Sequence, residues 1–268
     1  MQTGVIRFQD NALHVRRLGR GDALLFAFHG AGQKAQLFDS LERSIGHKYT
    51  IIAVELPGAG LSQWREPYVE KIALVTIVER FKLEQKVERF SVLAFGIGSL
   101  YALTLLEQRS SWVEQVLLFA PDGLKRRSWQ SVVMRHFWAK SRVQKAIAHP
   151  GQATKLLQGL QRWGIIKKDW QPEISRFVTD AAFRELWQRL YPVHYKLVPE
   201  IQKVRWQVKK DKVAVHIFCP EDKPTMKKDA FQFAKKQDFT QVEFWPPEDF
   251  NNTTLVLQKA ADILNPNH

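Results

Sequence analysis

An apolar segment that breaks at two glycines is the feature that most constrains the fold of this 268-residue chain. Residues 90–95 are apolar except for one serine, and an apolar helical pattern follows at residues 100–106. Gly96, Ile97 and Gly98 lie between the two. Glycine adopts a positive φ at no steric cost, so Gly96 suits a sharp turn from a strand into a helix. The segment predicts a buried strand, a tight turn and a helix that packs against the sheet.

Strand and helix patterns alternate on both sides of this turn. Four predicted strands are nearly continuous apolar runs, as expected of strands buried on both faces of a parallel sheet: residues 23–28, 49–54, 90–95 and 116–119. Residues 5–8 and 13–18 predict an opening hairpin, and two further strands are predicted at residues 213–218 and 242–244. Predicted helices cover residues 36–45, 69–82, 97–107, 226–236 and 253–264. This alternation predicts an α/β fold, with an opening hairpin and a parallel sheet that has helices on both faces.

The segment from residue 125 to residue 212 differs from the rest in charge. It contains 20 Lys and Arg against 6 Asp and Glu, whereas the remainder of the chain contains 20 against 21. No strand pattern occurs in it, tryptophans recur, and breaks at residues including Pro192 and Pro199 divide it into helices. We expect an inserted basic helical segment. Its charge either forms an ordinary solvated surface or attracts an anionic partner.

The organisation of the chain follows from these segments. An α/β core of residues 1–124 and 213–268 is interrupted by the insertion of residues 125–212. The single cysteine, Cys219, excludes an internal disulfide. The chain has no secretory leader pattern, and no apolar run approaches the roughly 20 residues that span a bilayer. We therefore expect a cytoplasmic protein, and we expect neither a metal nor a cofactor.

Four motifs, taken in order, resemble the α/β-hydrolase superfamily. Residues 28–32 (Phe-His-Gly-Ala-Gly) match the family's oxyanion-hole turn after its third strand. Residues 55–62 (Glu-Leu-Pro-Gly-Ala-Gly-Leu-Ser) match the loop after its fourth strand. The turn at Gly96 matches the nucleophile elbow, and the insertion begins where the family inserts its cap. The resemblance covers nearly the whole chain. It implies a mostly parallel eight-stranded sheet with helices on both faces and an inserted helical cap.

The resemblance also implies an oxyanion or ligand-binding site. The backbone N–H groups of Ala31 and Ile97 would face a developing oxyanion. Ile97 opens a helix, whose N-terminal dipole favours negative charge. His29 and Gly30 would order the turn that carries the first of the two donors.

The catalytic side chains of the family are replaced in this chain. The nucleophile position is Gly96, the acid position is Lys223 and the histidine position is Asp249. Two other residues are candidate acids: Asp222, if the alignment slips by one residue, and Asp122, which follows the sixth strand. Lys223 and Asp249 either form a salt bridge of reversed polarity or remain separate on the surface. Ester hydrolysis by the usual mechanism of the family is not expected.

Three functions are consistent with this pattern. The first is a non-catalytic protein that binds a small anionic or acyl ligand between core and cap. The second is an active enzyme, an esterase-like hydrolase or a lyase, whose acid–base steps use Asp122, Lys223 or Asp249. The third is a scaffold that binds nucleic acid or an anionic membrane through its basic insertion. We favour the first, because three catalytic side chains are lost together while the turns remain. The sequence does not specify the oligomeric state.

Overall fold

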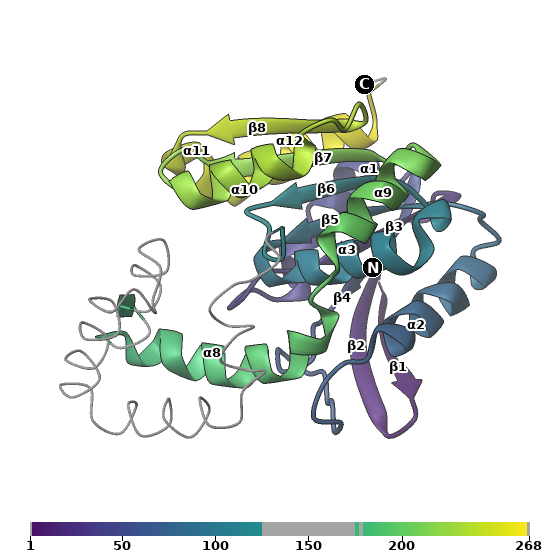
Figure 1. Cartoon of the computed structure of the whole chain (residues 1–268). Coiled ribbons are helices and arrows are strands. Elements are labelled where there is room, and N and C mark those ends of the chain that lie inside the picture. Colours follow the sequence, from purple (N-terminus) through teal and green to yellow (C-terminus); the bar gives the residue numbers. More distant parts are fainter. Residues whose placement is uncertain (1, 125–174, 177–178, 267–268) are drawn as a thin grey trace.

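The computed structural model describes residues 2–124, 175–176 and 179–266. Its centre is an eight-stranded sheet in the order β1-β2-β4-β3-β5-β6-β7-β8 (Figure 1). The opening hairpin is antiparallel, β2 pairs antiparallel with β4, and the other neighbours are parallel. The mostly parallel sheet expected from the sequence is confirmed. The strands are β1 (Gln2–Phe8), β2 (Asn11–Leu18), β3 (Ala23–Phe28), β4 (Tyr49–Val54), β5 (Phe90–Phe95), β6 (Val113–Phe119), β7 (Ala214–Pro220) and β8 (Thr240–Trp245).

Helices cover both faces of the sheet, and each face has its own cluster of buried side chains. On one face lie α2 (Lys71–Glu84), α3 (Ser99–Arg109), α9 (Ile201–Asp211) and α10 (Pro224–Ala234). On the other lie α1 (Leu41–Ile45) and α12 (Thr253–Leu264), with α11 (Pro247–Asn251) beside α12. Short 3₁₀ helices are η1 (Ala35–Phe38), η2 (Gly96–Gly98), η3 (Ser110–Trp112) and η5 (Tyr195–Leu197). None of the described helices combines the length and the apolar character that crossing a membrane requires.

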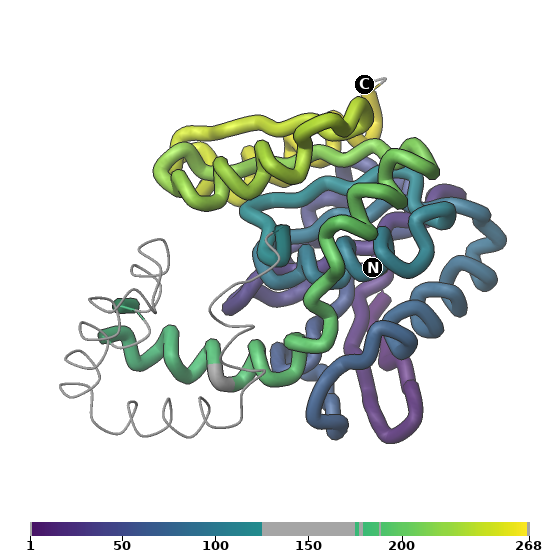
Figure 2. The backbone as a smooth tube through the Cα atoms, viewed as in Figure 1, coloured from purple at the N-terminus to yellow at the C-terminus, as the bar shows by residue number. Residues whose placement is uncertain are grey.

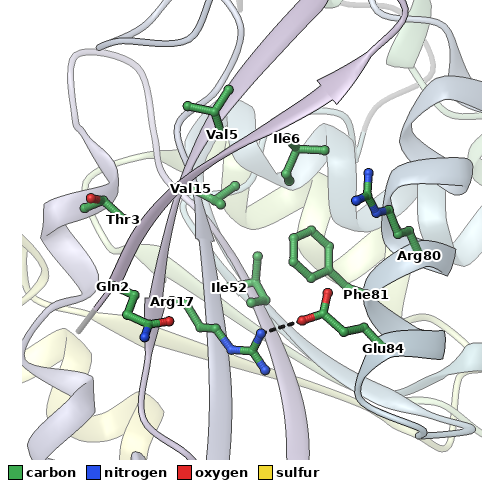
Figure 3. Close-up of a pocket in the computed structure, with 11 residues that line it drawn as sticks. Gln2, Thr3, Val5, Ile6, Val15, Arg17, Ile52, Arg80, Phe81 and Glu84 are labelled. Carbon is green, nitrogen blue, oxygen red and sulfur yellow. Dashed lines mark hydrogen bonds and ion pairs between the residues drawn. The ribbon is translucent and has the colours of Figure 1, made fainter.

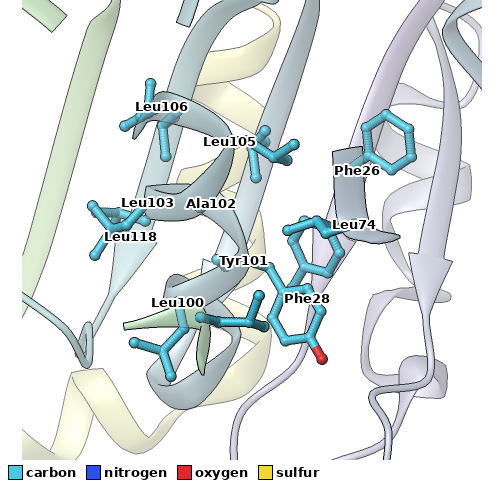
Figure 4. Packing of buried hydrophobic residues seen from close by; sticks show 14 of the residues in the cluster. Phe26, Phe28, Leu74, Leu100, Tyr101, Ala102, Leu103, Leu105, Leu106 and Leu118 are labelled. Carbon is cyan, nitrogen blue, oxygen red and sulfur yellow. The ribbon is translucent and has the colours of Figure 1, made fainter. Parts of the chain in front are cut away.

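The helix that follows β5 is almost entirely buried. Its leucines and Tyr101 face Phe26 and Phe28 of β3, Leu74 of α2 and Leu118 of β6 (Figure 4). The rings of Phe28 and Tyr101 stack with their centroids 5.1 Å apart. Each large apolar side chain buried in this way contributes about 1.5–3 kcal/mol. This packing fixes the position of the turn at the N-terminus of α3.

Only the last part of the predicted insertion is described, because residues 125–174 lie outside the described residues. The sequence predicts a helix break at Pro192, and this prediction is wrong: Pro192 lies inside α8 (Ala181–His194). The helix ends two residues later, so proline removes a hydrogen bond from its last turn only. Pro199 lies between η5 and α9, where a break is expected.

The helix α8 extends past the sheet on the side to which the arrow of β6 points (Figure 1), and its course can be followed in the tube of Figure 2. It is anchored at its C-terminal end by a hydrogen bond from the Val69 N–H to the Val193 carbonyl, at 2.7 Å. Along its length it contacts two turns of the core. The position of a Cβ added to Gly32 lies 3.6 Å from Leu186, and one added to Gly58 lies 3.1 Å from the Arg189 carbonyl oxygen. The helix therefore covers the edge of the sheet at which the predicted site lies.

Candidate functional site

Gly96 lies at the apex of the turn between β5 and α3, where its φ is +47°. A Cβ added there would meet only the Cα of Gly30, at 3.6 Å. The positive φ therefore favours a glycine at position 96, whereas the surrounding space would admit a side chain. Gly98 differs, because a Cβ there would lie 2.5 Å from the carbonyl oxygen of Phe28 and 2.7 Å from that of His29. Gly98 allows α3 to begin directly against the end of β3.

Replacing Gly98 by alanine should lower the free energy of unfolding by about 1–3 kcal/mol, because the added methyl group meets backbone atoms that cannot rotate away. Urea unfolding would measure the loss. Gly4→Ala is the matched control, since a Cβ at Gly4 meets only Val15, at an ordinary 3.8 Å. Equal stability of the Gly98→Ala protein and the unsubstituted protein would contradict the role assigned to this close approach.

The buried side chain of His29 holds the turn after β3 to the loop after β4. Its Nδ1 donates to the Gly30 carbonyl at 2.8 Å, and its Nε2 accepts from the Leu56 N–H at 3.0 Å. These partners assign the neutral tautomer with the proton on Nδ1. Burial lowers the pKa of His29, although the Gly30 carbonyl and the Glu55 carboxylate oppose the shift. Both ring nitrogens are occupied, so His29 orders the turn and has no free nitrogen for proton transfer.

Two backbone N–H groups, those of Ala31 and Ile97, lie next to this turn. Apart from bonds within helices and strands, neither donates a backbone hydrogen bond to another described residue. The turn itself is stabilised by the Gly30 N–H, which donates to Oε1 of Gln33 at 2.7 Å. N–H groups at a turn and at the start of a helix are the donors that stabilise a negatively charged oxygen.

Asp122 is held beside the turn at Gly96. Its backbone N–H donates to the carbonyl of Gly96 at 3.1 Å. Its half-buried carboxyl group faces α8, where the Tyr191 hydroxyl donates to Oδ2 at 3.5 Å. Tyr191 in turn stacks on Trp187, with ring centroids 5.3 Å apart. The structure thus places a carboxylate and the covering helix next to the turn.

Lys223 and Asp249 do not form the salt bridge considered from the sequence. The Lys223 ammonium lies 3.4 Å from Oδ2 of Asp222, and the two side chains are 60% and 47% exposed. Asp249 belongs to α11 and lines an open groove of about 290 Å³ with residues of α12, among them Lys259. Among the described residues, no hydrogen bond or ion pair connects Lys223 or Asp249 with the turn at Gly96. These two side chains remain separate on the surface.

Two side chains near the turn or the strand ends that could in principle act as nucleophiles, Cys219 and Ser99, are buried. Burial, with Asp229 nearby, raises the pKa of the Cys219 thiol to about 12, so it stays protonated at neutral pH. Ser99 is fully buried and its hydroxyl lacks a hydrogen-bond partner in the described part of the chain. The described residues also contain no group of three His, Cys, Asp or Glu side chains suited to a metal.

His194 is a buried residue beside the site that the sequence analysis did not single out. It lies near the end of α8, is fully buried and stands with its ring 5.5 Å from that of Tyr101. Its Nδ1 donates to the Leu190 carbonyl at 2.6 Å, while its Nε2 has no partner among the described residues. Burial lowers its pKa to about 4, with a further lowering from His29, and the Leu190 carbonyl opposes both. The sequence around His194 contains both polar and apolar residues, so it gives no indication that this histidine is buried.

Sequence comparison identifies curated relatives over part of the chain. No protein-family model matches it. The pimeloyl-acyl-carrier-protein methyl ester esterase of Legionella pneumophila is 29% identical over 130 residues, which cover 47% of this chain. The protein of the same name from Nitrosospira multiformis is 28% identical over 125 residues, or 44% of this chain. The chain spans about half the length of these relatives, 49% and 46% respectively.

These relatives contradict the preferred sequence-based interpretation of a non-catalytic binding protein. They are named as esterases and thus favour the alternative of an active, esterase-like hydrolase. The geometry is compatible with this correction. The absence of a side chain at Gly96 removes one reacting group, but the two N–H groups and the Asp122 carboxyl group remain beside the turn.

Structural comparison covers nearly the whole chain. The α/β hydrolase MGS-M2 from a Medee basin deep-sea metagenome library has a TM-score of 0.65 at 11% identity and covers 99% of this chain and 98% of its own. MenH from S. aureus has a TM-score of 0.64 at 12% identity, with 95% and 98% covered. At these identities the likeness concerns the fold alone. Together with the strand order and the turn at Gly96, it shows that the chain is an α/β-hydrolase-fold protein.

Proposed function

We propose that this protein hydrolyses an acyl ester beside the turn at Gly96, with water as the nucleophile. The observation that carries the proposal is the position of Asp122, whose N–H donates to the Gly96 carbonyl and whose carboxyl group accepts from Tyr191 of α8. The names of the curated relatives support ester hydrolysis as the reaction. Asp122 then acts as the general base in place of a histidine.

The reaction proceeds in two steps. The Asp122 carboxylate removes a proton from water as the water oxygen forms a bond to the carbonyl carbon of the ester. The electron pair of the carbonyl bond moves to oxygen, and the N–H groups of Ala31 and Ile97 stabilise the negative charge. When this intermediate collapses, the bond to the alkoxy oxygen breaks, and the leaving alcohol takes the proton from Asp122. The products are a carboxylic acid and an alcohol.

Water serves as the nucleophile in this proposal because the described residues offer no suitable side chain at the turn. Gly96 has no side chain, Cys219 is a protonated buried thiol, and Ser99 is fully buried. Tyr191 lies within hydrogen-bond distance of the Asp122 carboxylate and helps to orient it. A reaction without a covalent intermediate should be slow for this fold. Serine enzymes that lose their triad retain only ~10³–10⁴-fold acceleration over water.

The substrate class follows from the relatives and from charge. The relatives are named for a methyl ester of an acyl group, so a small alkyl ester of an acyl chain is the proposed substrate. Residues 125–212 contain 20 Lys and Arg against 6 Asp and Glu. This positive charge favours an ester substrate that carries a negative charge on another part of the molecule than the ester group.

Assays with short-chain p-nitrophenyl esters and with methyl esters of acidic acyl chains test this proposal. We expect turnover without an initial burst, and we expect it to persist after treatment with a fluorophosphonate, which reacts with activated serines. Protein carrying Asp122→Asn, prepared in the same way, controls for contaminating esterases. Turnover no faster than in buffer, or complete block by the fluorophosphonate, would overturn the proposal.

A further inference from the structure

A hollow of about 220 Å³ lies at the edge of the sheet, between the opening hairpin and α2 (Figure 3). Its strand side includes Ile6 of β1, Val15 of β2 and Ile52 of β4, and its helix side is formed by the last two turns of α2. The turn at Gly96 follows β5, which lies four positions from β1 and two from β4 in the strand order. None of the residues that line the hollow belongs to the turns at residues 28–32 and 96–98, so the hollow is separate from the candidate active site.

Gly4 forms part of the wall of the hollow. In the register of the hairpin, Gly4 pairs with Val15, and both line the hollow. A Cβ added to Gly4 would meet only Cγ2 of Val15, at 3.8 Å. A methyl group at this position therefore meets no backbone atom within 4 Å.

The floor of the hollow is apolar and buried. Ile6, Val15 and Ile52 are all buried, with exposed fractions of 8%, 6% and 0%. Phe81 of α2 points toward them, and its ring packs edge-on against Phe26 with centroids 5.9 Å apart. Such a surface favours an apolar chain, because each methylene group that leaves water contributes about 0.8 kcal/mol.

The rim of the hollow is positively charged. Arg17 and Arg80 both line it, with Glu84 as the acidic lining residue. Glu84 is already paired, since Oε1 accepts from Arg17 at 2.6 Å, and Arg17 also donates to Gln85 at 3.1 Å. Arg80 is exposed and forms no ion pair in the described part of the chain. The guanidinium group of Arg80 can therefore pair with an anion bound in the hollow.

We propose that this hollow binds a small amphipathic carboxylate, such as a medium-chain fatty acid. The apolar chain lies over Gly4 on the floor of Ile6, Val15 and Ile52, and the carboxylate pairs with Arg80. The volume is below the ~300–1,000 Å³ of sites for drug-sized molecules, so the ligand is short and narrow. This proposal is independent of the ester hydrolysis proposed above.

Calorimetric titration of the full-length protein with octanoate tests the site. We expect saturable binding of octanoate and at least tenfold weaker binding of neutral 1-octanol. Arg80→Gln should weaken octanoate binding at least tenfold. Gly4→Val should abolish it while leaving the melting temperature unchanged or raised, because valine suits a strand and fills the hollow.

Arg7→Gln is the matched control for Arg80→Gln. Arg7 is an exposed arginine of β1, the strand that also carries Gly4, and it does not line the hollow. This substitution should change octanoate affinity by less than twofold. Absence of octanoate binding would overturn the proposal. So would equal binding by the Arg80→Gln and unsubstituted proteins, or equal binding of octanoate and 1-octanol.

Discussion

Replacing Asp122 by asparagine should lower kcat for ester hydrolysis by about 10²–10⁴-fold, the usual contribution of a general base. Asparagine keeps the size of the side chain and the backbone hydrogen bond to the Gly96 carbonyl. Its amide cannot accept a proton from water. KM should change little, because Asp122 acts on water and not on the acyl group. Steady-state kinetics on a p-nitrophenyl ester would separate the two constants.

Two matched carboxyl-to-amide variants control for a general effect of charge. Asp222 is paired with Lys223 at an exposed position, and Asp249 lies in the open groove beside α12. Asp222→Asn and Asp249→Asn should each keep kcat within about twofold of the unsubstituted protein. A loss in Asp249→Asn as large as that in Asp122→Asn would place the base elsewhere and contradict the mechanism.

Acid should destabilise the protein by about 3 kcal/mol through His194 alone. The pKa of this residue is about 4 in the folded chain, against an ordinary value of 6.5. The unfolded chain therefore binds the proton more readily. The stability is fully present above pH 6.5 and is lost as the pH falls towards 4. The size follows from 1.36 kcal/mol for each pKa unit.

Denaturant unfolding of the unsubstituted and His194→Gln proteins between pH 4 and pH 7 measures this effect. The variant should be less stable at pH 7, where the hydrogen bond to the Leu190 carbonyl and the ring contact with Tyr101 are altered. Its stability should also fall less between pH 7 and pH 4. His29, whose pKa is also lowered, is present in both proteins. Parallel pH profiles of the two proteins would show that His194 does not titrate as described.

The arrangement of strands could be predicted from the sequence because buried parallel strands leave a local signal. The apolar runs at residues 23–28, 49–54 and 90–95 coincide with β3, β4 and β5. The 3₁₀ helix at η1 and the short helix α11 were not predicted as separate elements, since such short elements have no clear periodicity. The position of Pro192 inside α8 was also not predictable from the sequence. A helix accommodates a proline near its end at low cost, and the sequence does not show that α8 ends two residues after Pro192.

The site could be predicted only in part. Gly96 and Gly98 look alike in the sequence, but only the fold shows that Gly98 is required by close contact with β3. The relation of Lys223 to Asp249 depends on two loops far apart in the chain, and no local pattern determines whether they meet. His194 is missed for a similar reason, since its burial results from the packing of α8 against α3.

Intact-mass analysis of the protein, quenched during turnover of a saturating ester, tests direct attack by water at this site. We expect product to form while the mass of the protein stays that of the unmodified chain. A protein population heavier by the acyl group would reveal a covalent intermediate on some side chain. That result would contradict water as the nucleophile, and the absence of any product would contradict the esterase activity itself.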